Sequence, residues 1–127
     1  MERRPLALIT GATSGIGFAL AKLFAQNGFD LALTGRNPEV LRRIREEWEK
    51  EYNVDVKCCA HDLSVSSTPE DLCAAIQAEM MTVDVLVNNA GFGLRGEFAE
   101  LPLADQLAML QVNIVALTHL TRLVLPD

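Results

Sequence analysis

Three glycines and a serine follow a short apolar run near the N-terminus of this 127-residue chain. Residues 6–17 read Leu-Ala-Leu-Ile-Thr-Gly-Ala-Thr-Ser-Gly-Ile-Gly. The apolar run predicts a strand buried on both faces, as in a parallel sheet, and the pattern after it predicts a helix. Glycines permit a sharp turn and close approach of a ligand, and free N–H groups at a helix start bind anions such as a pyrophosphate. A plain strand-turn-helix corner is the other interpretation.

The spacing of these glycines excludes two common phosphate-binding loops. No Gly-Lys-Ser/Thr ending is present, so the segment is not a P-loop. The order is G-x-x-x-G-x-G, which also differs from the dinucleotide fingerprint G-x-G-x-x-G.

Further polar groups follow the later apolar segments in the same way. Arg36, Asp62 and the Asn-Asn-Ala-Gly turn at 88–91 each come directly after such a segment. Because the carboxyl ends of parallel strands share one edge of a sheet, we expect these groups near the glycine loop. For Arg36 the alternative is a solvent-facing cation, and for Asp62 it is a turn-forming carboxylate.

Periodicity and capping residues divide the chain into alternating strands and helices. Strands are predicted at 6–9, 30–34, 54–60 and 83–87. The first helix is predicted to carry its apolar stripe at Ile16, Leu20, Leu23 and Phe24 and to stop at Gly28. The later helices are predicted to start with caps at Asn37 and Thr68, and after Pro102.

This alternation predicts an α/β fold, a Rossmann-type doubly wound parallel sheet. Right-handed crossovers, a buried first strand and a third strand that alternates with charges give the strand order 3-2-1-4. The topological switch point then lies between strands 1 and 4. Ligands of such sheets bind there, where the glycine loop and the Asn-Asn-Ala-Gly turn meet.

Length and composition restrict the classes of function that this chain can have. One domain over residues 1–127 is the natural expectation, and a net charge of −6 argues against a nucleic-acid surface or an anionic membrane. Three cysteines form no disulfide framework, and no uninterrupted apolar window approaches 18 residues, so we expect a cytoplasmic protein without a membrane span. Cys58 and Cys59 point to opposite faces of a strand, so no metal site is expected.

The motifs taken together resemble the short-chain dehydrogenase/reductase family, classical type. The glycine loop, Arg36, Asp62, the turn at 88–91 and Asn113 occur in the order that this family shows, and the resemblance covers essentially the whole chain. It implies an oxidoreductase that transfers hydride between a nicotinamide and a small-molecule carbonyl or alcohol. A non-catalytic dinucleotide-binding or interaction module is the alternative.

The resemblance also implies a role for each site residue. The pyrophosphate would lie on the loop formed by Gly11, Thr13, Ser14, Gly15, Ile16 and Gly17. Asp62 would accept from the adenine amino group, with Leu63 beside the ring, and Asn89, Ala90 and Gly91 would line the ribose and nicotinamide. Asn113 would complete the catalytic tetrad; a buried amide satisfied by backbone is the compatible alternative.

The end of the second strand points to NADP(H) over NAD(H). Enzymes that prefer NAD hold the adenosine ribose with an acid near this position, but residues 34–37 read Thr-Gly-Arg-Asn. The guanidinium of Arg36, next to Asn37, suits a 2′-phosphate instead.

Two parts of the family pattern do not occur in these 127 residues. The family's catalytic Ser and its Tyr-x-x-x-Lys would follow later, so we expect the cofactor-binding half of a reductase that shows no carbonyl reduction by itself. The last helix, around 107–124, is apolar on all sides, which predicts burial in a homo-oligomer. The substrate, the reaction direction and any continuation past Asp127 stay open.

Overall fold

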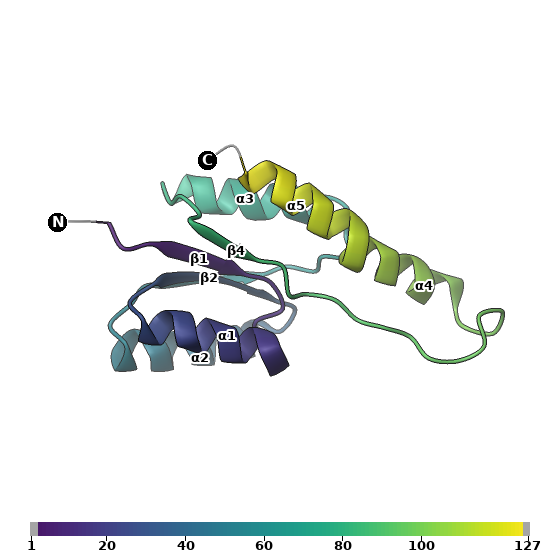
Figure 1. Cartoon of the computed structure of the whole chain (residues 1–127), viewed down its shortest axis with the longest axis horizontal. Helices are drawn as coiled ribbons and strands as arrows, with labels where there is room; N and C mark the ends of the chain where they lie inside the picture. The colour runs from purple at the N-terminus through teal and green to yellow at the C-terminus, as the bar shows by residue number, and fades with distance from the viewer. Residues whose placement is uncertain (1–2, 126–127) are drawn as a thin grey trace.

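The computed structural model describes residues 3–125 as alternating strands and helices (Figure 1). The strands are β1 (Leu6–Ile9), β2 (Asp30–Gly35), β3 (Val56–Ala60) and β4 (Val85–Val87). The helices are α1 (Gly15–Gln26), α2 (Pro38–Glu51), α3 (Thr68–Ala78), α4 (Leu103–Leu110), the π-helical segment η1 (Gln111–Ala116) and α5 (Leu117–Val124).

The strands form one sheet in the predicted order β3-β2-β1-β4. Every pairing is parallel, and β1 lies between β2 and β4 with Leu8 opposite Ala32 and Leu86. The buried first strand and the edge position of β3 are thereby confirmed. All four strands end at the same edge, which brings the loops that follow them together.

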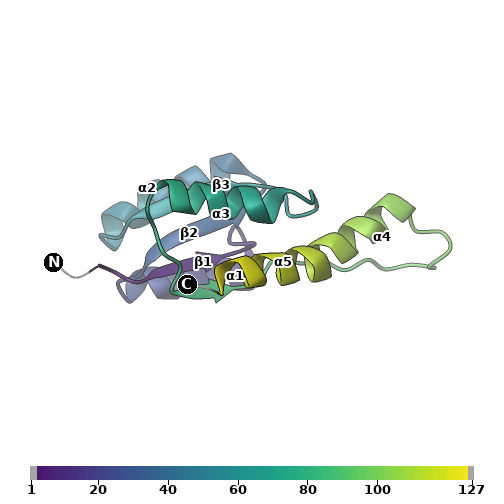
Figure 2. The same ribbon diagram turned by 90° about the horizontal axis from the view of Figure 1, so that it is seen from above.

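Helices cover the sheet on both faces, as a doubly wound fold requires (Figures 1 and 2). On one face, α1 and α2 pack against a core that contains Ile9, Leu31 and Trp48. On the other face, α3 and α5 pack against a second core that contains Leu8 and Leu72. Each residue of β1 is buried because both of its faces are covered.

The buried face of α1 differs from the predicted stripe. Gly17, Ala21 and Ala25 are buried, whereas Ile16 is 74% exposed and Leu23 is 53% exposed. Small residues let α1 lie close to the sheet, so Ile16 and Leu23 remain outside, whereas Phe24 of the predicted stripe is partly buried against the core. The predicted stop is confirmed, since Gly28 has φ +83° just after the last turn.

One of the two predicted caps is confirmed. The Asn37 side chain accepts hydrogen bonds from the N–H groups of Glu39 (3.0 Å) and Val40 (3.3 Å), which makes it the cap of α2. Thr68 is not a cap, because it is the first residue of α3, and its hydroxyl donates to the Asp62 carbonyl at 2.6 Å. It therefore anchors the loop after β3 to the start of α3.

The fourth strand begins two residues later than predicted because a side chain takes over part of its pairing. Asp84 Oδ2 accepts from the Leu6 N–H at 2.8 Å, and the Asp84 N–H donates to the Leu6 carbonyl at 2.9 Å. Arg3 forms two hydrogen bonds to the same carboxylate, at 2.7 and 2.9 Å. Asp84 thus joins the starts of β1 and β4.

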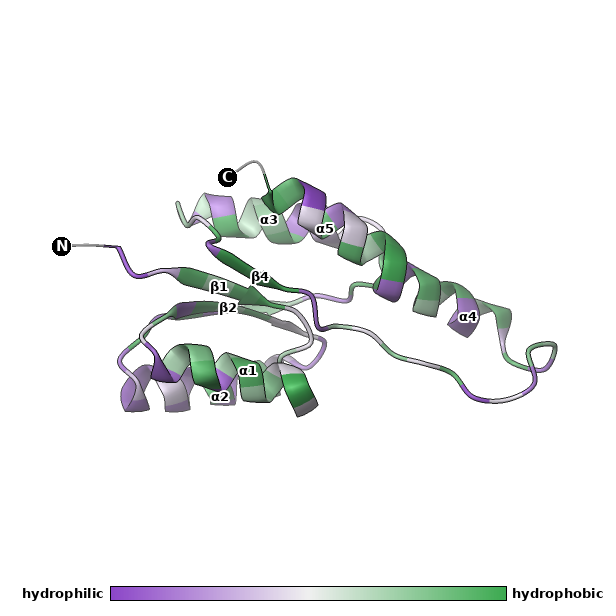
Figure 3. Ribbon diagram, in the orientation of Figure 1, coloured by the Kyte–Doolittle hydropathy of each residue, from purple (hydrophilic) through white to green (hydrophobic). Residues whose placement is uncertain are grey.

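The last helix carries its apolar residues on more sides than the sheet can cover (Figure 3). Val112, Ala116 and Leu120 are buried, but Leu107 and Ile114 are 57% and 56% exposed. The helix from Leu103 to Val124 is long and apolar enough to cross a membrane, by length and composition alone. The predicted absence of membrane contact therefore stays a prediction.

The Asp84 carboxylate makes acid stability testable. The hydrogen bond from Arg3, followed by that from the Leu6 N–H, lowers the Asp84 pKa to about 2, below an unfolded value of about 3.9. Its contribution to stability is present above the unfolded value and is lost as pH falls towards 2. We expect Asp84→Asn to lower the free energy of unfolding at pH 7 and to differ little from the natural chain at pH 2, as measured by urea unfolding.

Glu97→Gln, in an exposed loop, is the control and should leave the free energy of unfolding unchanged across this range. A deficit of Asp84→Asn that stays constant between pH 7 and pH 2 would contradict the role of the ionised carboxylate.

Candidate functional site

The Thr10 hydroxyl joins the glycine loop to the turn after β4. It is 2% exposed and accepts from the N–H groups of Asn89 (3.0 Å) and Ala90 (2.9 Å). It also donates to the Val87 carbonyl at 3.4 Å. The Asn89 side-chain amide forms hydrogen bonds in the opposite direction, because it donates to the carbonyls of Thr10 (3.2 Å) and Gly11 (3.0 Å). The two loops therefore hold each other in place.

Gly11 and Gly17 are required by close packing inside this junction. A Cβ on Gly17 would overlap the Gly11 carbonyl oxygen and the Asn89 Nδ2, and one on Gly11 would lie 2.9 Å from the Ala90 Cα. Gly11 also has φ +65°, which disfavours any side chain. Gly17 therefore positions the loop from beneath, and it does not line the cavity described below.

Gly15 and Ser14 present the start of α1 to open space. Gly15 has φ +60°, and a Cβ there would meet no atom within 4 Å. Ser14 occupies the cap position without a side-chain capping hydrogen bond, and the first turn carries no acidic residue. The first N–H groups of α1 are thus left for a ligand, and the helix dipole favours an anion.

A cavity of about 580 Å³ lies at the carboxyl ends of the strands. Ten residues predicted as ligand contacts line it: Gly11, Thr13, Ser14, Ile16, Arg36, Asp62, Leu63, Asn89, Ala90 and Gly91. Groups that were not predicted also line it: Thr34, Gly35, His61, Ser64, Phe92, Asp105, Ala108 and Val112. The predicted residues Gly15, Gly17, Asn37 and Asn113 lie outside this lining.

A second, mixed-charge hollow of somewhat smaller volume lies at the opposite end of the strands, and its charged side chains already pair with each other. Its volume is about 480 Å³, and it contains the ion pairs of Arg4 with Asp30 (2.9 Å) and Lys57 with Glu79 (2.7 Å). Charges that satisfy each other bind a ligand poorly, and none of the predicted contacts lies there. The cavity beside the glycine loop is the candidate site.

Asp62 combines a turn with a position in the cavity. Its Oδ1 accepts from the Ser64 N–H (2.9 Å) and the Ser64 hydroxyl (2.7 Å), so the turn-forming role is real. These hydrogen bonds, the backbone one first, lower the Asp62 pKa, and the Arg36 charge lowers it slightly further. The carboxylate therefore stays ionised, and the turn fixes its orientation beside the cavity.

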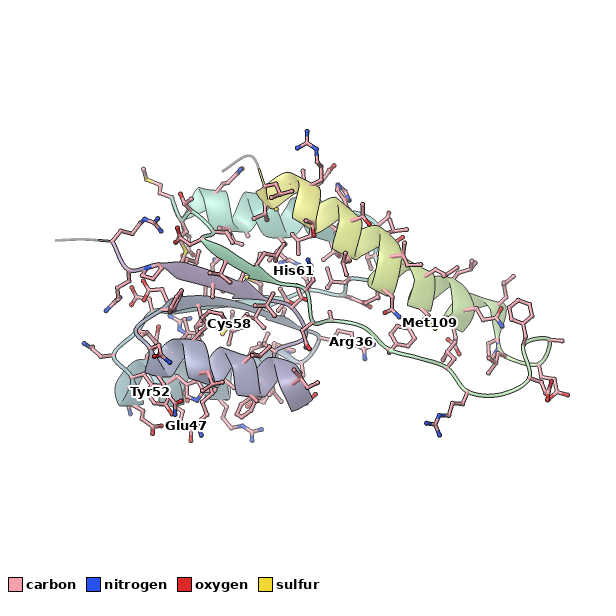
Figure 4. The ribbon with its side chains drawn as sticks, in the orientation of Figure 1. Arg36, Glu47, Tyr52, Cys58, His61 and Met109 are labelled. Carbon is pink, nitrogen blue, oxygen red and sulfur yellow. The ribbon has the colours of Figure 1, made fainter. Side chains whose placement is uncertain are left out.

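The end of β2 supplies an exposed cation and a tightly packed glycine. Arg36 is exposed and lines the cavity (Figure 4). A Cβ on Gly35 would lie 2.5 Å from the Thr13 Cγ2, so the glycine lets the two loops meet. The neighbouring Asn37 uses its Oδ1 to cap α2, which leaves its Nδ2 as the remaining donor.

Asn113 lies in the π-helical segment and binds the loop after β4. Its Oδ1 accepts from the Phe92 N–H at 3.0 Å, and its Nδ2 donates to the Phe92 carbonyl at 2.8 Å. A Cβ on Gly91 would lie 2.9 Å from the Asn113 Oδ1, so this glycine permits the contact. The amide is satisfied by backbone, as the alternative interpretation proposed, and π-helical segments are frequent at functional sites.

The apolar wall of the cavity comes from residues far apart in the chain. Leu63 packs with Val112, Ala116 and Ala90 in a small core of its own. Val112, Ala108 and Asp105 reach the cavity from the last helix, and the sequence carries no local signal for this because only tertiary packing places that helix there. Thr10 and His61, by contrast, stand next to predicted residues in the sequence.

The cysteines take no part in this site. Cys58 packs with the α1 and α2 side of the sheet and Cys59 with the other side, which confirms the predicted opposite faces. Burial raises the Cys59 pKa to about 11, so its thiol is an inert core group. His119 lies 3.5 Å from the Glu70 carboxylate and links α5 to α3, away from the cavity.

Comparison with known proteins gives the class. The sequence profile of the family described as short chain dehydrogenase matches residues 5–127. The NADP-dependent 3-hydroxy acid dehydrogenase YdfG of Salmonella typhi is 34% identical over 95% of this chain and 48% of its own length. The chain belongs to the short-chain dehydrogenase family, and it spans about half the length of the curated relatives it matches.

Solved structures show the same architecture. The L-sorbose reductase from Gluconobacter frateurii, in complex with NADPH and L-sorbose, matches with a TM-score of 0.90 and 27% identity over 97% of this chain and 47% of its own. An alcohol dehydrogenase from the archaeon Thermococcus sibiricus, in complex with 5-hydroxy-NADP, matches with a TM-score of 0.90 and 31% identity over 98% of this chain and 53% of its own.

The close packing beneath the loop predicts opposite outcomes for two glycines of α1. An alanine at position 17 would overlap backbone and Asn89, and we expect Gly17→Ala to lower the free energy of unfolding by about 3 kcal/mol. Gly15→Ala meets no atom, so only its positive φ opposes it, at about 1 kcal/mol. Chemical denaturation of the two variants measures both values.

Gly28→Ala is the matched control, because Gly28 also has positive φ and open surroundings. It should cost about as much as Gly15→Ala. Equal losses for all three variants would show that the junction beneath the loop does not depend on Gly17.

Proposed function

We propose that residues 1–127 form a single NADP(H)-binding domain of Rossmann type in a short-chain dehydrogenase/reductase. The observation that carries the proposal is one cavity with an uncapped helix start at one wall and an exposed guanidinium at another. The first wall fits a pyrophosphate and the second fits a 2′-phosphate. The complexes of the two solved relatives with NADPH and with 5-hydroxy-NADP support the same cofactor.

Each wall of the cavity would hold one part of the dinucleotide. The N–H groups after Ser14 and Gly15 would bind the pyrophosphate, and Arg36 would pair with the 2′-phosphate. Asp62 would accept from the adenine amino group through the oxygen that Ser64 leaves open. Asn89, Ala90 and Gly91 would line the side of the nicotinamide, where Asn113 holds the neighbouring Phe92 in position.

When bound, the nicotinamide supplies hydride transfer to or from a carbonyl or alcohol. The residues of this chain bind the cofactor, orient it and keep its adenosine end in a partly buried cavity. A whole protein of this family would supply the catalytic serine and the Tyr-x-x-x-Lys pattern, which do not occur in the 127 residues. We therefore propose an NADP(H)-dependent oxidoreductase, with a non-catalytic dinucleotide-binding module as the second candidate. We also propose a cytoplasmic location, because three cysteines in the sequence provide no disulfide framework.

Substitution of Arg36 tests whether the site prefers NADPH over NADH. A charge-assisted hydrogen bond contributes about 1.5–3 kcal/mol, which corresponds to about tenfold to hundredfold in affinity. We expect Arg36→Gln to weaken NADPH binding by that factor and to leave NADH binding unchanged, as measured by calorimetric titration. Arg36→Asp should go further and favour NADH, because a carboxylate accepts from the ribose hydroxyls.

Arg43→Gln is the matched control, since Arg43 is an exposed arginine on the outer face of α2. It should change neither affinity. Equal binding of NADPH and NADH by the natural chain would refute the assignment of the 2′-phosphate to Arg36.

We further propose that the last helix joins two copies of the chain. Its exposed stripe follows helical spacing and consists of Leu103, Leu107, Leu110, Ile114 and Leu117. No Asp, Glu, Lys or Arg lies in the helix between Asp105 and Arg122. An apolar surface of this length is costly in water, and a second copy would cover it.

A pair of substitutions tests this association. We expect the natural chain to sediment as a dimer or larger assembly at tens of micromolar, and Leu107→Glu with Ile114→Glu to sediment as a monomer. Leu23→Glu, an equally exposed apolar position on α1, should leave the assembly intact. A natural chain that is monomeric, or that requires detergent or lipid to remain dispersed, would contradict the proposed homo-oligomer.

A further inference from the structure

An imidazole at the half-buried end of the cavity has no role in the contacts proposed so far. His61 follows the last residue of β3 and lines the cavity next to Asp62. Its backbone N–H donates to the Cys59 carbonyl at 2.9 Å, which turns the chain sharply at the strand end. Within residues 3–125 the ring makes no hydrogen bond or ion pair, so its N–H donor is available to a ligand.

The residues that line the cavity differ in burial, which distinguishes the part that suits a charged phosphate from the part that suits a flat purine ring. Arg36 is exposed, His61 and Asp62 are half-buried, and Leu63 is buried against Val112. A doubly charged phosphate is costly to desolvate and stays near the exposed guanidinium. A purine ring is largely apolar and fits beside the buried leucine. The base of the dinucleotide would therefore lie at the end that His61 lines.

The polar groups at this end match the pattern of adenine. The Asp62 carboxylate only accepts hydrogen bonds, and Ser64 occupies its Oδ1, so an amino group of the base can donate to Oδ2. The ring nitrogens beside that amino group are acceptors and require a donor. A neutral imidazole always carries one N–H, which makes His61 such a donor.

We propose that His61 donates a ring N–H to a ring nitrogen of adenine while Asp62 accepts from the exocyclic amino group. The inference rests on the proposed NADP(H) site and adds a residue that recognises the base. It predicts a contribution common to NADPH and NADH, because both contain adenine and differ only at the 2′-phosphate.

Two substitutions separate the donor from the ring. His61→Phe keeps a flat ring of similar size and removes the donor, whereas His61→Gln keeps an N–H donor. We expect His61→Phe to weaken both NADPH and NADH binding by about threefold to tenfold, as one neutral hydrogen bond implies. His61→Gln should restore most of this affinity. Arg36→Gln, titrated in parallel, should weaken NADPH alone.

Calorimetric titration of the 127-residue chain tests the proposed hydrogen bond of His61. Circular dichroism checks that each variant folds. A loss in His61→Phe that is confined to NADPH would place His61 at the phosphate and overturn the proposal. Unchanged affinity in His61→Phe would overturn it as well, because stacking would then suffice. If the natural chain binds neither dinucleotide, the proposed function fails first, and this is seen before any variant is compared.

Discussion

The buried hydroxyl of Thr10 is the interaction on which the rest of the site depends. A threonine hydroxyl has one donor and two acceptor positions, and this one uses all three. It fixes the turn after β4 against the end of β1, which lies in the centre of the sheet. Removing this hydroxyl would leave the half-buried Ala90 N–H without its acceptor, at a cost of about 1–3 kcal/mol. The two walls of the cavity are therefore positioned by one small side chain.

The glycines of the site matter as much as the residues with side chains. Gly17 allows α1 to approach the carbonyl of Gly11, Gly35 allows β2 to approach Thr13, and Gly91 allows the loop after β4 to approach Asn113. A methyl group at any of these positions would force a neighbouring atom to shift, and at Gly17 the nearest such atom is a backbone carbonyl oxygen. Gly15 differs, because its surroundings are open and its positive φ is the only local requirement. The first three glycines position the site, and the fourth leaves room for an anion.

The last helix connects the site to a second property of the chain. Its buried face supplies Val112 to the cavity and Asn113 to the loop after β4, within the π-helical segment η1. Beyond the sheet, α4 extends away from the rest of the molecule with its apolar residues exposed (Figures 1 and 2). A cover for this surface would also stabilise the helix that closes the cavity, so association and cofactor binding are expected to be coupled.

The sequence by itself determined the sheet order and most of the cavity lining. Short apolar strands, capping residues and turn residues are local signals, and parallel crossovers have one hand, so the order β3-β2-β1-β4 and the meeting of the loops follow from pattern alone. The glycine loop, Arg36 and Asp62 could be placed for the same reason, because each directly follows a strand.

Only the tertiary structure decided which faces are buried and which groups pair across the chain. The first helix buries glycine and alanine rather than Ile16, since close approach to the sheet outweighs side-chain hydrophobicity there. The Asp84 carboxylate takes over part of the pairing at the start of β4, Thr68 anchors a loop instead of capping α3, and Val112 reaches the cavity from a distant helix. Such choices depend on distances between segments far apart in sequence, and periodicity carries no information about those distances.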